Sequence, residues 1–198
     1  MDVTLRNKGS DTTLDEYQAR SGTLAVYPGR GNYQVIYPVV ALAEEAGELA
    51  GKLLKLFQVQ YMAAPGAPDH PVADAALTLA ATNGLILGLL KKAYRNEPQG
   101  QLTPERVEQI RQALILGHRA LHQVSDAIMA GGQFAFPPIV IPDGELDVVV
   151  KEAGDPLWYV AAFCTEARVA LGYVGDVNYA KLVDRKKRGV IASTGDDR

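Results

Sequence analysis

The stretch YPVVALAEEAGELAGKLLK, from Tyr37 to Lys55, sets three glutamates inside an apolar helical run. Leucines and alanines, which are strong helix formers, surround Glu44, Glu45 and Glu48. Residues three positions apart share one face of a helix, so Glu45 and Glu48 point the same way, one turn apart. Their carboxylates repel each other unless a positive charge lies between them. The stretch therefore predicts a core helix that carries an acidic pair.

Composition indicates an ordinary soluble globular protein. The chain has 198 residues, of which 47% are hydrophobic and 22% charged, and this length suits one well-cored domain over residues 1–198. The net charge of -3 offers no basic footprint for duplex nucleic acid or for an anionic membrane, so we expect neither as a partner. A negatively charged substrate would need local cations or a metal ion.

The N-terminal residues and the single cysteine indicate a cytoplasmic protein. Cys164 lies among apolar neighbours at helical spacing, so it predicts a buried structural thiol and excludes a disulfide within the chain. The first residues, MDVTLRNKGSDTTLDEY, are charged and contain no apolar signal core. The longest uncharged helical run, Ala75 to Leu90, contains Thr78 and Asn83 and is shorter than a membrane span.

Apolar residues recur with helical period along the chain, and no segment alternates strictly, so we predict an all-α helical bundle. Thr103 is the expected N-cap of a helix that opens at Pro104, and Pro38 requires a place in the first turn of its helix. GYVGD is expected to be a turn, and Phe134 to Ile141 holds the one candidate strand, although its prolines favour an extended loop. The expected helices are Thr13–Arg20 with Asp11 or Thr12 as cap, Tyr33–Gln60, Val72–Arg95, Pro104–Met129, Glu145–Leu171 and Val177–Lys187.

A second acidic pair occurs in KEAGDPLWY, where Glu152 and Asp155 have the same spacing as Glu45 and Glu48. Antiparallel packing of the two helices would bring the four carboxylates together. Four like charges in a partly desolvated site raise one another's pKa values, and a hard divalent cation with oxygen ligands, such as Mg²⁺, removes that conflict. The residues by themselves thus point to a carboxylate metal site.

A solvated helix face explains the same spacing. In that alternative Lys52, Lys55 and Lys151 neutralise the glutamates, as is common on helix surfaces. The apolar LWY that follows the second pair argues against a polar stripe made only for water. The pattern leaves both interpretations open.

Taken together, EEAGE, KEAGDPLWY, NYAKLVDRKKRG and GDDR resemble the MazG family of all-α nucleoside triphosphate pyrophosphohydrolases. The resemblance covers roughly Asp15 to Lys55 and Glu145 to Arg198. Two departures are the proline at Pro156 and the long segment Tyr61 to Gly144, which holds two extra helices where the family has a short loop. The family signature, EExxE followed by ExxD, is matched at Glu44, Glu45, Glu48, Glu152 and Asp155.

The resemblance implies cleavage of a nucleoside or deoxynucleoside triphosphate between the α and β phosphates, with Mg²⁺ as cofactor and Mn²⁺ as a substitute. Glu44 or Glu45 would accept a proton from the attacking water. A homodimer is expected, because the inserted helical pair would complete in cis a bundle that small family members complete with partner subunits. The implied metal ligands are Glu45, Glu48, Glu152 and Asp155, the phosphate-binding residues Asn178, Lys181 and Arg185, and the base-contacting residues Trp158 and Tyr159, for which core packing is an equal alternative.

Two other functions compete with this one. A non-catalytic helical interaction module would retain the divalent-metal site without activity, whereas a prenyl-diphosphate synthase would need aspartate-rich motifs and a longer chain. His118 and His122 have the spacing of a zinc-binding helix, but Arg119 stands where such helices carry a glutamate, and no third ligand is evident.

Overall fold

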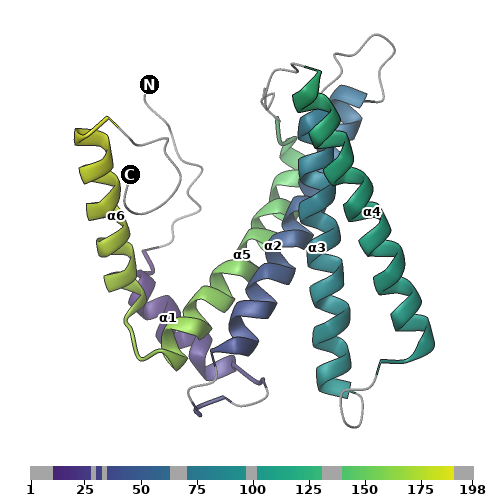
Figure 1. Cartoon of the computed structure of the whole chain (residues 1–198). Coiled ribbons are helices and arrows are strands. Elements are labelled where there is room, and N and C mark those ends of the chain that lie inside the picture. The colour runs from purple at the N-terminus through teal and green to yellow at the C-terminus, as the bar shows by residue number, and fades with distance from the viewer. Residues whose placement is uncertain are drawn as a thin grey trace. The chain divides into compact units, whose positions relative to one another are not determined.

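The computed structural model describes residues 11–27, 30–32, 35–62, 71–96, 102–130 and 140–189, and all regular structure within them is helical (Figure 1). The all-α prediction is therefore confirmed for these residues. The chain divides into two compact units, Met1–Val35 with Val160–Arg198, and Ile36–Tyr159. Both acidic motifs belong to the larger unit.

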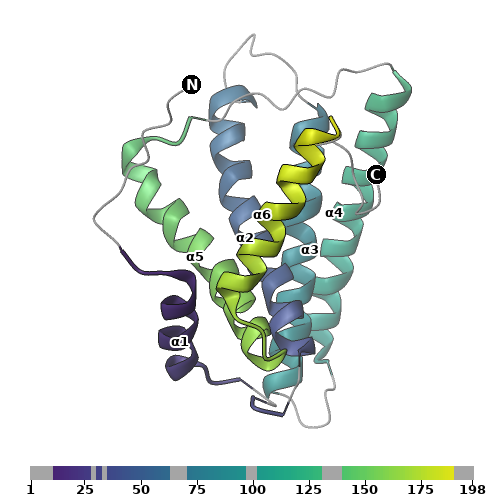
Figure 2. The ribbon, with the colours of Figure 1, turned by 90° about the vertical axis from the view of Figure 1, so that its left-hand side faces the viewer.

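Helices α2, α3 and α4 of the larger unit lie side by side as consecutive antiparallel neighbours (Figures 1 and 2). Pro38 occupies the first turn of α2, where its missing N–H removes no helical hydrogen bond, and α4 begins and ends where the sequence predicts. The Thr103 hydroxyl accepts a hydrogen bond from the Arg106 N–H at 3.3 Å, as an N-cap does. The elements are α2 (Ile36–Phe57), the π-helical turn η1 (Gln58–Met62), α3 (Pro71–Asn96), α4 (Pro104–Met129) and most of α5 (Asp143–Glu166).

Small residues bring α3 into close contact with both of its neighbours. A Cβ built on Gly84 of α3 would lie 2.6 Å from the Cα of Gly47 in α2. On the other side, a Cβ built on Gly117 of α4 would lie 3.3 Å from the Thr82 hydroxyl oxygen. Of the two inserted helices, α3 thus packs against the acidic helix α2, and α4 packs on α3. Their close approach explains why buried alanines dominate here, namely Ala41, Ala73, Ala75, Ala113 and Ala120.

Helix α3 also contains a stretch, Val72–Lys92, that is long and apolar enough to cross a membrane by length and composition, with a mean hydropathy of 1.5 over 21 residues. This stretch is longer than the uncharged run Ala75 to Leu90, because it includes the charged residues Asp74, Lys91 and Lys92. In the structure this stretch packs between α2 and α4, and 39% of it is buried. The absence of a membrane partner and the cytoplasmic location stay predictions.

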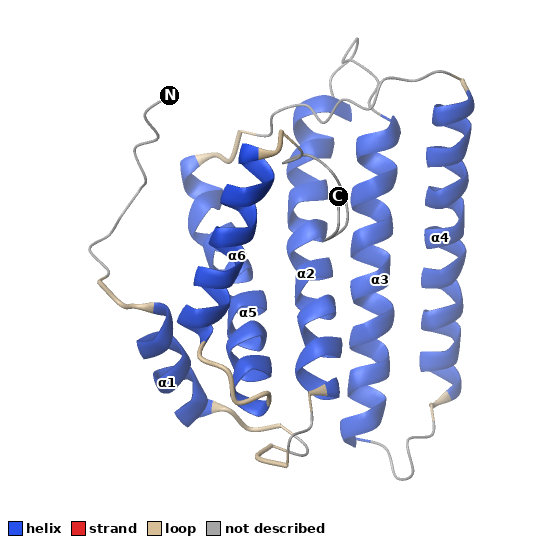
Figure 3. Cartoon of the chain, turned by 60° about the vertical axis from the view of Figure 1, so that its left-hand side comes forward, coloured by secondary structure: helices blue, strands red, loops and turns tan. Residues whose placement is uncertain are grey.

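The smaller unit contains α1 (Leu14–Leu24), the end of α5 from Val160 and α6 (Leu171–Lys187), with α1 packed on α6 (Figure 3). Thr13, rather than Asp11 or Thr12, caps α1 in a capping box: the Glu16 N–H donates to the Thr13 hydroxyl at 3.2 Å, and the Thr13 N–H donates to the Glu16 carboxylate at 2.8 Å. Cys164 is buried beside Leu171, and burial raises the pKa of its thiol, so the structural-thiol prediction is confirmed.

The predicted turn at GYVGD is wrong, because those residues belong to α6. The chain turns earlier, at Ala167–Ala170, where Arg168 adopts a left-handed φ of 57°. The two glycines allow the helices to pack closely instead: the Gly172 N–H donates to the Asp15 carboxylate at 2.7 Å, and a Cβ built on Gly175 would lie 3.3 Å from Leu14.

Helix α5 ends at Glu166, earlier than expected, and continues through Pro156 without a break. Most of the candidate strand at 134–141 and the chain beyond Gly189 lie outside the described residues.

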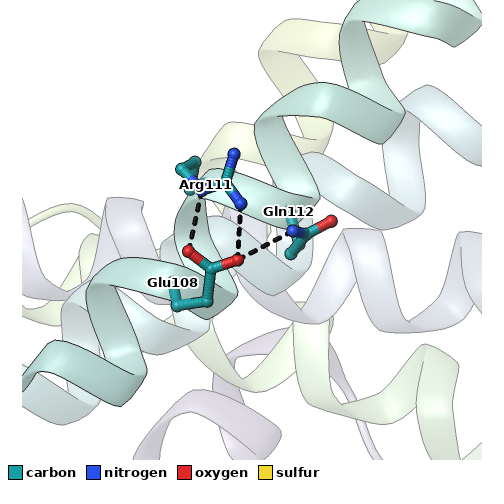
Figure 4. A network of polar contacts seen from close by, with 3 residues as sticks. All are labelled: Glu108, Arg111 and Gln112. Atoms are coloured by element: carbon teal, nitrogen blue, oxygen red, sulfur yellow. Dashed lines mark hydrogen bonds and ion pairs between the residues drawn. The ribbon is translucent and has the colours of Figure 1, made fainter.

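An exposed polar network marks the outer surface of α4 (Figure 4). The Arg111 guanidinium donates two hydrogen bonds to the Glu108 carboxylate, each 2.7 Å long, and the Gln112 amide donates a third at 2.8 Å. Hydrogen bonds from Arg111 and Gln112 lower the pKa of Glu108 to about 2. Because the network faces water, it contributes little to stability.

The close α2–α3 contact can be tested with Gly84→Ala. We expect this substitution to lower the free energy of unfolding by about 1–3 kcal/mol, because the added methyl group meets backbone that cannot yield. Gly154→Ala is the matched control: no atom lies within 4 Å of its built Cβ, so the free energy of unfolding should rise by roughly 0.5–1 kcal/mol. Urea unfolding followed by circular dichroism compares them. Equal stability of the two variants would contradict the close approach.

Tyr27 provides a test in the smaller unit. Its buried hydroxyl donates to the Glu166 carboxylate at 2.8 Å; burial, followed by this hydrogen bond, raises the pKa of Tyr27 well above its usual value. The buried Tyr27 hydroxyl stabilises the fold fully at pH values below about 10, the pKa of tyrosine in the unfolded chain. This stabilisation is lost as the pH rises from there toward the higher pKa of Tyr27 in the folded protein. The free energy of unfolding should therefore fall more steeply above about pH 10 in the wild type than in Tyr27→Phe. Parallel pH curves would refute the buried pair.

Candidate active site

The three glutamates of the first motif have different environments on α2. Glu44 is buried, with 4% of its surface exposed, and faces α3. Glu45 is partly buried, and Glu48 is exposed. The helical period separates the motif into one residue directed into the helix packing and two nearer to solvent.

Lys91 of α3 neutralises the buried part of this motif. Its ammonium forms a close ion pair with the Glu44 carboxylate and lies 3.4 Å from Oε1 of Glu45. Only 11% of the Lys91 side chain is exposed, and its ammonium lies 5.4 Å from the centre of the Tyr159 ring. Gly88 makes room for this pair, because a Cβ built there would lie 2.5 Å from Oε1 of Glu44.

Sequence reasoning did not single out Lys91, although a signal for it exists. Gly84, Gly88 and Lys91 follow one another at helical spacing, so they share the face of α3 that meets α2. A lysine that continues a face of small residues after a long uncharged run indicates a cation directed at the neighbouring helix.

Burial governs the ionisation of this cluster. Burial raises the pKa of Glu45 most strongly, the neighbouring Glu48 and Glu44 raise it further, and Lys91 opposes them. For Lys91, burial works to lower the pKa, but the hydrogen bond to Glu44 and the surrounding negative charges outweigh it, so the pKa is raised. Burial raises the pKa of Tyr159 most strongly, and nearby Tyr37, Glu45 and Glu44 raise it further. Lys91 acts in the opposite direction, and the resulting pKa is about 12.

Three contacts show that α5 runs antiparallel to α2. The rings of Tyr37 and Tyr159 are 6.5 Å apart between centroids at the start of α2. Farther along, the Lys52 ammonium lies 3.4 Å from Oε1 of Glu152. Beyond α2, the Val140 N–H donates to the Gln60 side chain at 3.2 Å. Contacts farther along α2 thus involve residues nearer to the N-terminus of α5.

Between the first two contacts lie Glu45 and Glu48 on α2 and Asp155 on α5, and Glu152 itself contacts Lys52, one turn beyond Glu48. Asp155 is exposed and Glu152 is partly buried. Within the part of the chain that the structure describes, no three histidine, cysteine, aspartate or glutamate side chains converge closely enough to hold a metal ion. Lys52 and Lys91 instead lie against the carboxylates. Lys52 is one of the partners that the solvated-face alternative names, although it pairs across helices rather than along one.

The remaining candidates lie in different surroundings. Asn178 and Lys181 are exposed, and Arg185 is partly buried, on α6 of the smaller unit. Trp158 packs edge-on against Tyr159 with 4.6 Å between ring centroids, so this pair contributes to packing, and base contact stays a prediction. On α4, Nε2 of His118 lies 3.0 Å from Nε2 of His122. Both rings are exposed, and no third ligand accompanies them among the described side chains.

Comparisons with known proteins give one partial relative. No family model matches the chain, and no solved structure matches it. The Gene 37 protein of Mycobacterium phage L5 is 42% identical over 59 residues, which make up 30% of this chain and 52% of that protein. The chain thus spans about half the length of this relative, and the name of that protein does not state an activity.

The buried ion pair makes a direct prediction for Lys91→Met. We expect the free energy of unfolding to fall by about 3–5 kcal/mol, because the change leaves Glu44 buried without a countercharge. Adding Glu44→Gln should recover most of this loss, since the double variant buries no unpaired charge. Lys92→Met is the matched control on the exposed face of α3 and should change stability by no more than about 0.5 kcal/mol. Urea unfolding measures all four proteins. A double variant no more stable than Lys91→Met would show that the two residues are not coupled.

Proposed function

We propose that this protein is a Mg²⁺-dependent nucleoside triphosphate pyrophosphohydrolase that yields a nucleoside monophosphate and pyrophosphate, with the MazG-like bundle as its fold. The observation that carries the proposal is the antiparallel register of α2 and α5, marked by the contact between Lys52 and Glu152. This contact directs Glu152 of the second acidic pair at the helix that carries the first pair, within one unit. A surface face made only for water has no need of a second acidic pair, at the same spacing, on the helix that contacts it.

The donor atoms fit a hard divalent cation. Glu45, Glu48, Glu152 and Asp155 supply carboxylate oxygens, which Mg²⁺ prefers and Mn²⁺ accepts. Glu48 and Asp155 are exposed, so both are accessible to a metal-bound nucleotide. When bound, the metal neutralises the triphosphate and promotes ionisation of the attacking water.

Of the two proposed proton acceptors, Glu45 fits better than Glu44. Glu44 is buried and held by Lys91, so its carboxylate is withdrawn from water. Glu45 is partly exposed, so a water molecule can reach its carboxylate. In this role Glu45 takes a proton from water while the oxygen attacks in line with the breaking bond. Glu44 then stabilises the packing of α2 against α3 and takes no part in the reaction.

The remaining parts of the proposal concern substrate and assembly. Asn178, Lys181 and Arg185 of α6 bind phosphate oxygens, with the Arg185 guanidinium suited to a bidentate contact. Trp158 and Tyr159 contact the base. The chain forms a homodimer, which is supported by large apolar side chains that α4 leaves exposed, namely Val107, Leu114, Leu116 and Leu121.

A helical interaction module that retains a divalent-metal site is the second candidate. It is favoured by the same lysines that lie against the carboxylates: with Lys91 and Lys52 as countercharges, the acidic helices pack without a metal. Under this alternative the metal site has no catalytic use, and the inserted helices contact another protein.

Hydrolysis of a panel of ribo- and deoxynucleoside triphosphates with Mg²⁺ separates the two functions. We expect pyrophosphate and monophosphate as products, and no activity with a chelator. Glu48→Gln and Asp155→Asn should each lower kcat at least about 100-fold, because each removes a metal-binding charge and little packing. Glu108→Gln, an exposed glutamate on α4, is the matched control and should keep full activity. Release of orthophosphate would reassign the cleaved bond, and no hydrolysis of any nucleotide would favour the module.

A further inference from the structure

Lys91 belongs to the inserted helices, yet it reaches the first acidic motif. Its two carboxylate contacts differ: the one with Glu44 is close and buried, and the one with Glu45 is longer, at 3.4 Å. The centre of the Tyr159 ring lies 5.4 Å from the ammonium. Lys91 is therefore held firmly at Glu44 and lies more loosely against Glu45.

An ammonium group and a divalent cation stabilise a carboxylate in the same way. Both lower the cost of keeping its charge in a partly desolvated place, and they repel each other when both are close. The Lys91 ammonium cannot leave the region, because burying Glu44 without a countercharge is costly. It can give up the longer contact with Glu45 and keep the closer one.

We propose that Lys91 is a resident counter-cation of the acidic motif, and that a divalent metal binds at Glu45 only by displacing the Lys91 ammonium from that carboxylate. The inference rests on the proposed metal site. Under this proposal α3, one of the inserted helices, contributes to the metal site through Lys91. Lys91 neutralises the acidic helix while no metal is bound, and it lowers the metal affinity of the nucleotide-free protein.

Metal affinity measured without nucleotide tests this inference. Binding of Mn²⁺ to the full chain, followed by electron paramagnetic resonance, should be about tenfold tighter in Lys91→Met than in the wild type, because a like charge near the incoming cation is removed. Lys91→Arg should stay close to the wild type, because the positive charge remains. Lys92→Met, an exposed lysine on the same helix, is the matched control and should bind as the wild type does.

A second comparison covers the case in which Lys91→Met fails to fold. Glu44→Gln removes the buried charge, so Glu44→Gln/Lys91→Met should fold and should bind Mn²⁺ more tightly than Glu44→Gln alone. A purely structural role for Lys91 predicts equal or weaker binding on its removal. Equal, weaker or absent binding in both comparisons would overturn the inference.

The outcomes for the two proposals are separable. Tighter Mn²⁺ binding on removal of Lys91, in a protein that hydrolyses no nucleotide, would support the counter-cation and reject the hydrolase. Hydrolysis with an unchanged Mn²⁺ affinity would support the hydrolase and reject the counter-cation.

Discussion

The buried ion pair between Glu44 and Lys91 is the constraint that links the acidic motif to the inserted helices. An isolated carboxylate in the packing between two helices is unfavourable by several kcal/mol, so a helix that buries Glu44 requires a cation from its neighbour. α3 supplies that cation, and Gly88 leaves space for the carboxylate. Gly88 and Lys91 of α3 thus both accommodate a single charge on α2.

Close packing of the same two helices has a second consequence for the larger unit. Gly47 and Gly84 bring the backbones together, and the residues buried nearby are mainly alanines. Small residues pack the backbones densely but bury little apolar surface each, and larger side chains such as Leu85 and Leu114 remain exposed. The larger unit therefore combines a tight helix seam with apolar surface that another chain can cover, which agrees with the proposed homodimer.

The acidic residues themselves show how one motif serves two purposes. The helical period places Glu44 toward α3 and leaves Glu45 and Glu48 nearer to solvent, so the motif contributes both to packing and to a surface that faces α5. Lys52 and Lys91 balance the carboxylates on the two sides of α2. A positive charge therefore lies against the carboxylates on each of these two sides.

Residue patterns along the chain predicted the helical class, the ends of α4 and the equal spacing of the two acidic pairs, and they required Pro38 to lie in a first turn, because these features depend on residues close together in the chain. Tertiary structure alone decided the partners. The Lys91 pair joins separate helices, and the glycines of α6 that resemble a turn instead allow α1 to approach. Local patterns record the period of a helix, but which neighbour fills a face depends on contacts between residues distant in sequence, and these form only when the chain folds.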